Sequence, residues 1–313
     1  MKDPSASRQV LLPPHGLLLA LLHVAWASPG SSNDEEYVSL SHADATILAS
    51  SRRKVFRTIR EQQKKARTEK LLSYPNQGKA VECAAAAKVS SHFLRDGSFT
   101  RFADWRFVHR ARLNLVPLNG VRNFNNNSRG CRRCNYECET LQHVLCHCMR
   151  YSRLFQKRHN DIVDRIKKAA SGRWIINAEN HSFAGLSLRP DLILTRDGTC
   201  LILDVTVAFE NRLSALIRAR QEKESKYQPL VERLKERFSK VRVEAIVVGA
   251  LGSWDPRNDR VIHRICSRKY ASLMKKLIVS DTIRTSRDIY VEHLTGERQI
   301  PWQHRQNTPR PTN

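Results

Sequence analysis

The chain has 313 residues, enough for about two domains at roughly 150 residues per domain. Hydrophobic residues make up 41% and charged residues 27%, which supports a packed core and excludes wholesale disorder. The net charge of +24 predicts a polyanionic partner, nucleic acid before an anionic membrane. No apolar run reaches the roughly 20 residues of a membrane-spanning helix, so we expect no membrane partner.

Residues 1–30 resemble a secretory signal. Lys2 and Arg8 precede the apolar run Gly16–Ala27, and Ala25–Ala27 matches a small-x-small cleavage site. The alternative is a spurious leader from an imperfect gene model. A genuine signal would make the protein secreted, whereas the sequence that follows is typical of a nuclear protein.

Residues 31–130 are predicted to form a helical, basic region. Its first helix, 51–70, holds nine basic side chains against Glu61 and Glu69, without Pro or Gly. That helix is either a solvated face or an arm that contacts phosphates, and we favour contact through Arg52, Arg53 and Lys54.

Two further helices are expected at 79–95 and 100–115. In the second, aromatic side chains alternate with arginines. Aromatic residues at helical spacing usually belong to a core, which we expect of Phe102 and Trp105. The neighbouring arginines remain free to hold a backbone phosphate, and the candidates are Arg101, Arg106, Arg110 and Arg112.

Five of the eight cysteines fall between 131 and 148, which favours a metal site over a disulfide framework. The spacing Cys131-x2-Cys134-x8-His143-x4-Cys148 supplies three thiolates and an imidazole, the donors that tetrahedral Zn²⁺ prefers. Four such ligands indicate a closed structural site. Cys138 and Cys146 are alternatives for a ligand, and reduced thiols or disulfides are the alternative to zinc.

The C-terminal half predicts a mixed sheet flanked by helices. After a helix at 152–170, strands at 192–194 and 200–209 are joined by the turn Arg196–Gly198. Later elements are helices at 211–227 and from 229 to about 240, a buried strand at 241–248, a helix at 258–279 and a disordered end at 300–313.

Two carboxylates are placed for divalent-cation chemistry. Asp191 opens one predicted strand and Asp204 lies on the next, so a hairpin brings both to the same edge. With the carbonyl of Val205 they would suit Mg²⁺, which can polarise a phosphate and activate water. Lys223 or Lys226, on one face of the following helix, would steady the transition state. The alternative is two ordinary turn aspartates and a charged helix.

From about residue 79 to 280 the combination resembles the C-terminal region of polyproteins of site-specific non-long-terminal-repeat retrotransposons, in the lineage with a restriction-like endonuclease. The resemblance is carried by Arg110–Pro117, the cysteine cluster, Arg158–Asn160, Arg189–Asp191, Asp204–Val207, Phe209–Glu210, Lys223-x2-Lys226-Tyr227 and Gly249–Trp254.

The resemblance implies a mixed α/β PD-(D/E)xK fold that nicks target DNA to prime reverse transcription. It assigns Asp191 and Asp204 as Mg²⁺ ligands and Lys223 or Lys226 as catalytic lysine, where ordinary restriction enzymes would have lysine at Thr206. The domains expected are a zinc knuckle at 131–148, a helical linker at 149–184, the endonuclease at 185–280 and a tail at 281–313. Nucleic-acid contacts are expected from Arg52, Arg53, Lys54, Arg110, Arg112, Arg132, Arg133, Arg158 and Arg189.

No consecutive Asp-Asp pair is present, so we expect no reverse transcriptase activity. We therefore expect a fragment that lacks the polymerase active site. It would act on DNA beside the polymerase portion of a parent polyprotein, with the element's RNA as a further partner. Three hypotheses remain: a Mg²⁺-dependent endonuclease, a catalytically inactive zinc-dependent nucleic-acid-binding remnant, and a secreted disulfide protein.

Overall fold

The computed structural model describes residues 55–121, 128–183 and 185–299, which divide into two units at Leu71. Several predictions lie outside these residues: the leader, the basic residues Arg52, Arg53 and Lys54, and the end at 300–313. Within the described part, no helix has both the length and the apolar character needed to cross a bilayer.

In the first unit the structure describes helix α2 (Val55–Ser73). The last two residues of this helix belong to the second unit. None of its residues from Phe56 on is buried, and the pairs Arg57–Glu61 and Lys65–Glu69 lie four residues apart on its surface. Such pairs support a helix that is polar all round. The predicted basic helix is thereby confirmed from Val55 on, and its contact with phosphates stays a prediction.

The second unit begins with short helices. Instead of one helix at 79–95, the chain forms α3 (Gln77–Ala85), a 3₁₀ turn (Lys88–Ser91) and α4 (Phe93–Asp96). Helix α4 ends at Gly97, whose φ of 67° is the left-handed conformation common after a helix. Helix α5 (Phe102–Arg112) follows, close to the range predicted.

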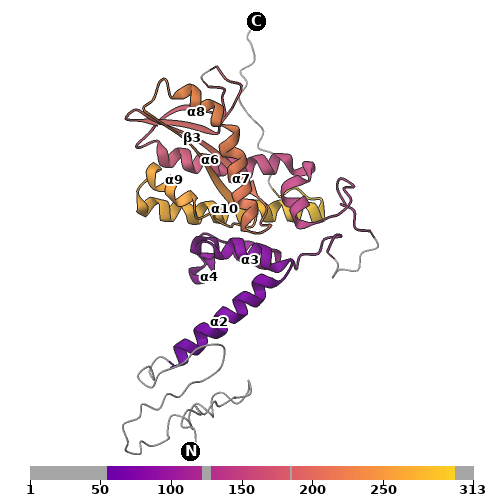
Figure 1. Ribbon diagram of the computed structural model, residues 1–313. Helices are drawn as coiled ribbons and strands as arrows, with labels where there is room; N and C mark the ends of the chain where they lie inside the picture. Colours follow the sequence, from indigo (N-terminus) through magenta and orange to yellow (C-terminus); the bar gives the residue numbers. More distant parts are fainter. Residues whose placement is uncertain (1–54, 122–127, 184, 300–313) are drawn as a thin grey trace, which may run out of the picture. The chain divides into compact units, whose positions relative to one another are not determined.

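The elements after the cysteine cluster run helix, three strands, two helices, one strand and two helices. In order they are α6 (Ser152–Ala170), β1 (Ile175–Glu179), β2 (Leu192–Arg196), β3 (Thr199–Ala208), α7 (Leu213–Lys226), α8 (Gln228–Leu234), β4 (Lys240–Gly249), α9 (Asn258–Ile265) and α10 (Arg268–Thr295) (Figure 1).

The sheet has the order β1-β2-β3-β4, with antiparallel pairs except for the parallel pair β3–β4. The predicted hairpin is confirmed, because Arg196 pairs with Thr199 across the two-residue turn Asp197-Gly198. Both turn residues have positive φ, 48° and 70°, as a type I′ turn requires. The mixed α/β class is likewise confirmed.

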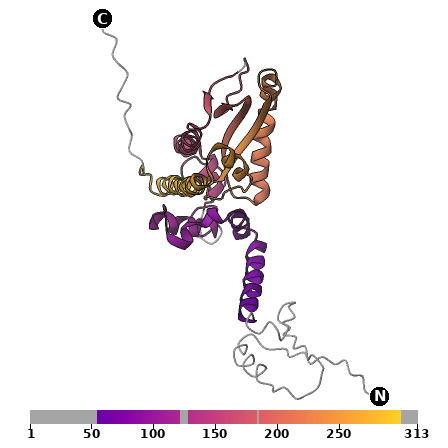
Figure 2. The ribbon, with the colours of Figure 1, turned by 90° about the vertical axis from the view of Figure 1, so that its left-hand side faces the viewer.

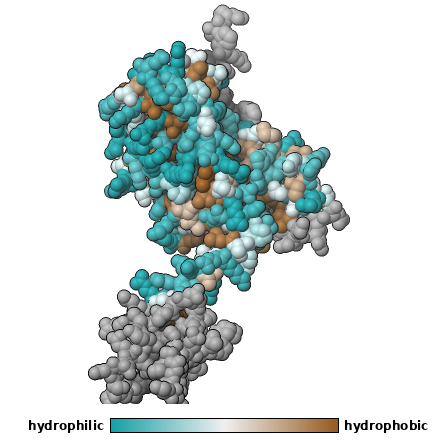
Figure 3. Space-filling model, in the orientation of Figure 1, coloured by the Kyte–Doolittle hydropathy of each residue, from teal (hydrophilic) through white to brown (hydrophobic). Residues whose placement is uncertain are grey.

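Alternating side chains divide the sheet between two layers of helices. Leu194, Leu203 and Ile246 face a large core that includes residues of α6, α9 and α10. Ile193 and Ile202 point to the other face and pack on α8, while Val247 packs against Leu216 of α7. Figure 2 shows the sheet between α6 and α10 on one side and α7 on the other. The outer surface in Figure 3 is largely hydrophilic, with scattered apolar patches.

Three predicted boundaries were wrong. The segment 149–184 is not only a helical linker, since β1 joins the sheet before residue 185. The predicted helix 258–279 is two helices, and the side chain of Ser267 accepts a hydrogen bond from Tyr270 N at the start of α10. Helix α10 continues to Thr295, so the tail does not begin at 281.

Candidate functional site

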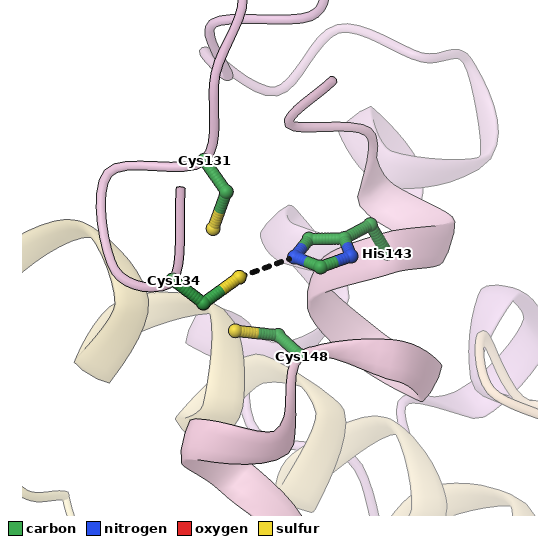
Figure 4. A group of neighbouring side chains, drawn as sticks. All are labelled: Cys131, Cys134, His143 and Cys148. Carbon is green, nitrogen blue, oxygen red and sulfur yellow. Dashed lines mark hydrogen bonds between the residues drawn. The ribbon is translucent and has the colours of Figure 1, made fainter. Parts of the chain in front are cut away.

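The four predicted zinc ligands meet at one point. One donor atom from each of Cys131, Cys134, His143 and Cys148 lies within 4.8 Å of the others. Figure 4 shows Cys131 and Cys134 on a loop, facing His143 on a helical turn and Cys148 directly after that turn. Cys138 and Cys146 are outside the group, and all eight cysteines, each in the described part of the chain, are free of disulfides.

Local backbone geometry explains why these residues converge. Asn135, at a φ of 59°, donates its N–H to the carbonyl of Cys131 and closes the loop that carries the first two ligands. Residues His143–His147 form a π-helical turn, in which Cys148 N bonds to His143 O at 2.7 Å. This bond joins the other two ligand residues directly, and π turns are frequent at functional sites.

The donor set fits Zn²⁺. Burial raises the pKa of Cys148 to about 12 and also raises that of Cys131, while burial lowers the pKa of His143. A neutral imidazole is the form that coordinates a metal, and the buried thiols would release their protons to solvent when the metal binds. The ring of Tyr136 stacks on His143 at 4.5 Å between centroids and holds its orientation.

Glu139 ties this cluster to the rest of the unit. Its fully buried carboxylate accepts hydrogen bonds from Asn119 N, from Arg132 and from His293 Nε2. Burial by itself raises the pKa of Glu139, but these donors outweigh it and hold the pKa well below its usual range. Cys131, Glu139 and His293 also lie within 4.8 Å of one another. Because Glu139 is already saturated by protein donors, we regard that group as structural.

The two predicted carboxylates lie at the same end of the β2–β3 hairpin, Asp191 directly before β2 and Asp204 on β3. Leu192 pairs with Leu203, so the same register continued by one residue places Asp191 opposite Asp204. Asp191 Oδ2 accepts from Val205 N at 2.6 Å and contacts His159 Nε2 at 3.0 Å. His159 Nε2 also lies 3.2 Å from the carbonyl oxygen of Val205. Asp191 Oδ2 and the carbonyl oxygen of Val205 thus both lie within 3.2 Å of His159 Nε2, and the role of Asp191 and Asp204 as metal ligands stays a prediction.

The structure distinguishes the two candidate lysines. Lys223 Nζ lies 2.6 Å from Asp204 Oδ2, and Asp204 is only 3% exposed. Lys226 Nζ instead contacts the hydroxyl of Tyr227 at 3.3 Å. That hydroxyl donates to the carbonyl of Arg189 at 2.9 Å. Lys223 is thus the lysine next to a predicted metal ligand.

His159 was not assigned a role from the sequence, although it lies in the Arg158–Asn160 motif. Burial lowers its pKa, but the hydrogen bond to Asp191 and the charges of Asp191 and Asp204 outweigh burial and raise it. His159 is carried by α6, on the opposite side of the sheet from Lys223 on α7. Its position beside Asp191 therefore depends on the packing of α6 on the sheet.

The arginines predicted to hold nucleic acid differ in availability. Arg110 and Arg189 are exposed. Arg132 is bound to Glu139, and Arg133 donates to the carbonyls of His293 and Leu294. The prediction that Arg112 and Arg158 contact nucleic acid was wrong. These residues are only 9% and 3% exposed, and they donate to Leu251 O and Leu145 O respectively. Their guanidiniums stabilise the fold and are not free for a phosphate.

The Gly249–Trp254 motif also has a structural role. The buried carboxylate of Glu210 accepts from Leu251 N at 2.8 Å and Ser253 N at 3.2 Å. A Cβ on Gly249 would lie 2.0 Å from Glu210 Oε1, so only glycine fits. The loop thereby holds the end of β3 against β4.

Arg220, one turn before Lys223 on α7, fixes that helix to the edge strand β4. Its guanidinium donates to Asp255 Oδ2 at 2.9 Å, to Asn258 Oδ1 at 2.5 Å and to the carbonyl of Ala245. Asn258 in turn bonds both the N–H and the carbonyl of Val247. At Ala245 and Val247 the edge of the sheet formed by β4 is thus covered by side chains.

Replacing this arginine tests how firmly the helix is held. We expect Arg220→Met to lower the free energy of unfolding by about 3–5 kcal/mol, because it leaves the buried Asp255 without its cation. The matched control is Arg218→Met, an exposed position on the same helix, which should stay within about 0.5 kcal/mol of wild type. Urea unfolding measures both, and equal stabilities would contradict the role of Arg220.

Comparisons with known proteins support the coarser part of the resemblance, a retrotransposon polyprotein. The chain is 30% identical over 210 residues to the retrovirus-related Pol polyprotein from type-1 retrotransposable element R2 of Popillia japonica, covering 64% of this chain and 43% of that protein. It is 26% identical over 194 residues to the polyprotein of the same name from Nasonia vitripennis, covering 58% and 19%. No family model matches the chain.

The chain spans less than half the length of these curated relatives. The matches support a retrotransposon polyprotein as the source of the sequence. They concern a region of that polyprotein, so its activities as a whole belong to the proposal that follows.

Proposed function

We propose that the chain is a Mg²⁺-dependent endonuclease that nicks DNA, derived from a retrotransposon polyprotein and built on a PD-(D/E)xK-type sheet. The proposal is supported above all by the 2.6 Å contact of Lys223 Nζ with Asp204 Oδ2 and by a β2–β3 register that, continued by one residue, sets Asp191 opposite Asp204. The order α6, β1–β3, α7–α8, β4 is compatible with such a sheet. The similarity to polyproteins of element R2 supports the same assignment.

Each residue would have a separate task. Asp191, Asp204 and the carbonyl of Val205 would hold Mg²⁺, which when bound polarises a phosphate and activates water. Lys223 would neutralise charge that develops on the phosphate oxygens. His159 would orient Asp191 through its 3.0 Å contact. The cysteine cluster would hold a structural Zn²⁺ that fixes the segment between α5 and α6.

DNA would be held by cationic side chains outside the site. Arg189, adjacent to the Asp191 loop, and Arg110 are exposed and suited to phosphates. The net charge of +24 predicts that affinity falls steeply as salt rises. A nuclear location and association with element RNA and the polymerase portion of a polyprotein go with this proposal.

Supercoiled-plasmid nicking by the full chain, with and without Mg²⁺, tests the proposal. Wild type should convert plasmid to the open circle only with Mg²⁺. Lys223→Met should lower the nicking rate by about 100-fold or more, whereas Lys226→Met, three residues away on α7, should lower it less than about fivefold, because Lys226 contacts Tyr227 and not a carboxylate.

The second candidate function is a non-catalytic nucleic-acid-binding remnant. It is favoured by the pairing of each aspartate with a protein group, Asp204 with Lys223 and Asp191 with His159. Absence of nicking with any divalent cation, together with tight, salt-sensitive DNA binding, would establish this function instead.

A further inference from the structure

Helix α5 carries a continuous stack of three aromatic rings on its outer face. Phe102, Trp105 and His109 are spaced three and four residues apart, so they lie on one stripe of the helix. The ring centroids are 5.5 Å apart in both neighbouring pairs, with interplanar angles of 19° and 8°. The rings therefore form one near-parallel column, here called the α5 ring stack.

The ring at one end of the stack is exposed to solvent. Phe102 is 73% exposed, which corrects the expectation that it belongs to the core. Trp105 is partly buried against the core, so it anchors the middle of the column. The opposite stripe of α5, with Phe107, Val108 and Ala111, is the one that is buried. The ring of Phe102 is consequently not needed for the packing of this helix.

A second exposed ring precedes the helix. Phe99 is 45% exposed and has a φ of 62°, a left-handed conformation that bulky residues rarely adopt. The fold thus leaves the rings of Phe99 and Phe102 exposed to water within four consecutive positions. At Phe99, glycine or asparagine would adopt the left-handed backbone conformation at a lower free-energy cost.

The α5 ring stack has more basic than acidic neighbours, although the acids Asp104 and Asp288 lie close to Arg101. Its exposed neighbours in the sequence are Arg95, Arg101, Arg106 and Arg110. The acid within α5, Asp104, is buried and held by Arg101 through two hydrogen bonds of 2.8 and 2.9 Å. A ligand that lies on Phe102 would therefore have the exposed Arg106 and Arg110 of the same helix within the neighbouring turns.

We propose that the α5 ring stack binds unpaired bases of a single-stranded nucleic acid. A base stacked on the open face of Phe102 would extend the column, and the adjoining phosphates would lie beside the arginines. In a duplex the bases already stack on one another and offer no free face, so the surface selects single strands. A protein partner could also bury the rings, but a nucleic acid brings a stacking base and a phosphate in each repeating unit, which matches rings and arginines on one helix.

The test measures binding of the full chain, without added divalent cation, to three labelled probes of about 12 nucleotides. They are an oligothymidylate, a strand of the same length made of abasic sites, and a duplex. Wild type should bind the oligothymidylate about 5- to 100-fold more tightly than the abasic strand, the range that base–aromatic stacking provides. Phe102→Ala should remove most of this preference and leave duplex affinity within twofold.

Two variants separate stacking from other effects. Phe102→Trp keeps a ring and should retain the preference. Tyr270→Ala, at a 37% exposed aromatic residue in the first turn of α10, should behave as wild type. An unchanged oligothymidylate affinity in Phe102→Ala would overturn the proposal in favour of a protein-docking face. An equal loss on duplex, or failure of Phe102→Trp, would overturn it as well. All of these measurements are binding affinities and none requires cleavage. They therefore remain valid even if the chain fails to nick plasmid DNA.

Discussion

Asp204→Asn is expected to abolish Mg²⁺-dependent nicking, with a rate at least about 100-fold below wild type, while DNA affinity stays within about twofold. Asparagine keeps the size of the side chain but removes the negative charge that would hold the metal. The fold should survive, because Asp204 pairs with Lys223, a side chain that is 31% exposed and can turn to solvent. Plasmid nicking and fluorescence anisotropy on a labelled duplex measure the two quantities.

The matched control for this prediction is Asp197→Asn. Asp197 lies in the turn at the other end of β3, and its side chain is 88% exposed. The same chemical change there should leave nicking at the wild-type rate. If Asp204→Asn and Asp197→Asn nick equally well, Asp204 is not a metal ligand and the proposed site is wrong.

Cys148→Ser is expected to lower both bound zinc and thermal stability. Serine is a poor zinc ligand, and Cys148 is fully buried in the same core as Val144, Leu145 and residues of α10. Structural zinc sites contribute folding free energy directly. A loss of even about 4 kcal/mol corresponds to a fall in Tm of about 10 °C for a unit of this size. Zinc content per chain and thermal melting check the two effects together.

Cys138→Ser is the control for the zinc prediction. Cys138 lies in the same segment, and its Sγ accepts from Arg129 at 3.5 Å, outside the group of four ligands. We expect one zinc per chain and an unchanged Tm in this variant. Full zinc occupancy in Cys148→Ser, with loss of zinc in Cys138→Ser, would show that the ligand set was assigned wrongly.

Features that depend on short stretches of sequence were predictable. The ligand spacing of the cysteine cluster gave the group that the structure brings together, because the loop at Asn135 and the π turn at His143 are local. The β2–β3 hairpin was predictable for the same reason, since Asp197-Gly198 suits a type I′ turn. The turn fixes the register, and the register places Asp191 opposite Asp204.

Element boundaries were less predictable where tertiary contacts decide them. Strand β1 is short, and its exposed Ile175 gives no alternating pattern that would identify a half-buried strand. It forms because its backbone pairs with β2. Helix α10 extends well past its predicted end because Ile283, Ile289 and Tyr290 pack into the core, which a composition-based boundary cannot detect.

By itself, the sequence determined the cluster of three cysteines and a histidine and the β2–β3 hairpin, since each depends on residues close along the chain. Only the tertiary structure decided that Lys223 and His159 meet the two predicted aspartates, because α6 and α7 pack on opposite faces of the sheet. The same packing buries Arg112 and Arg158 while it leaves Phe102 in solvent. Periodicity identifies the stripes of a helix, but the partner elements decide which stripe is covered.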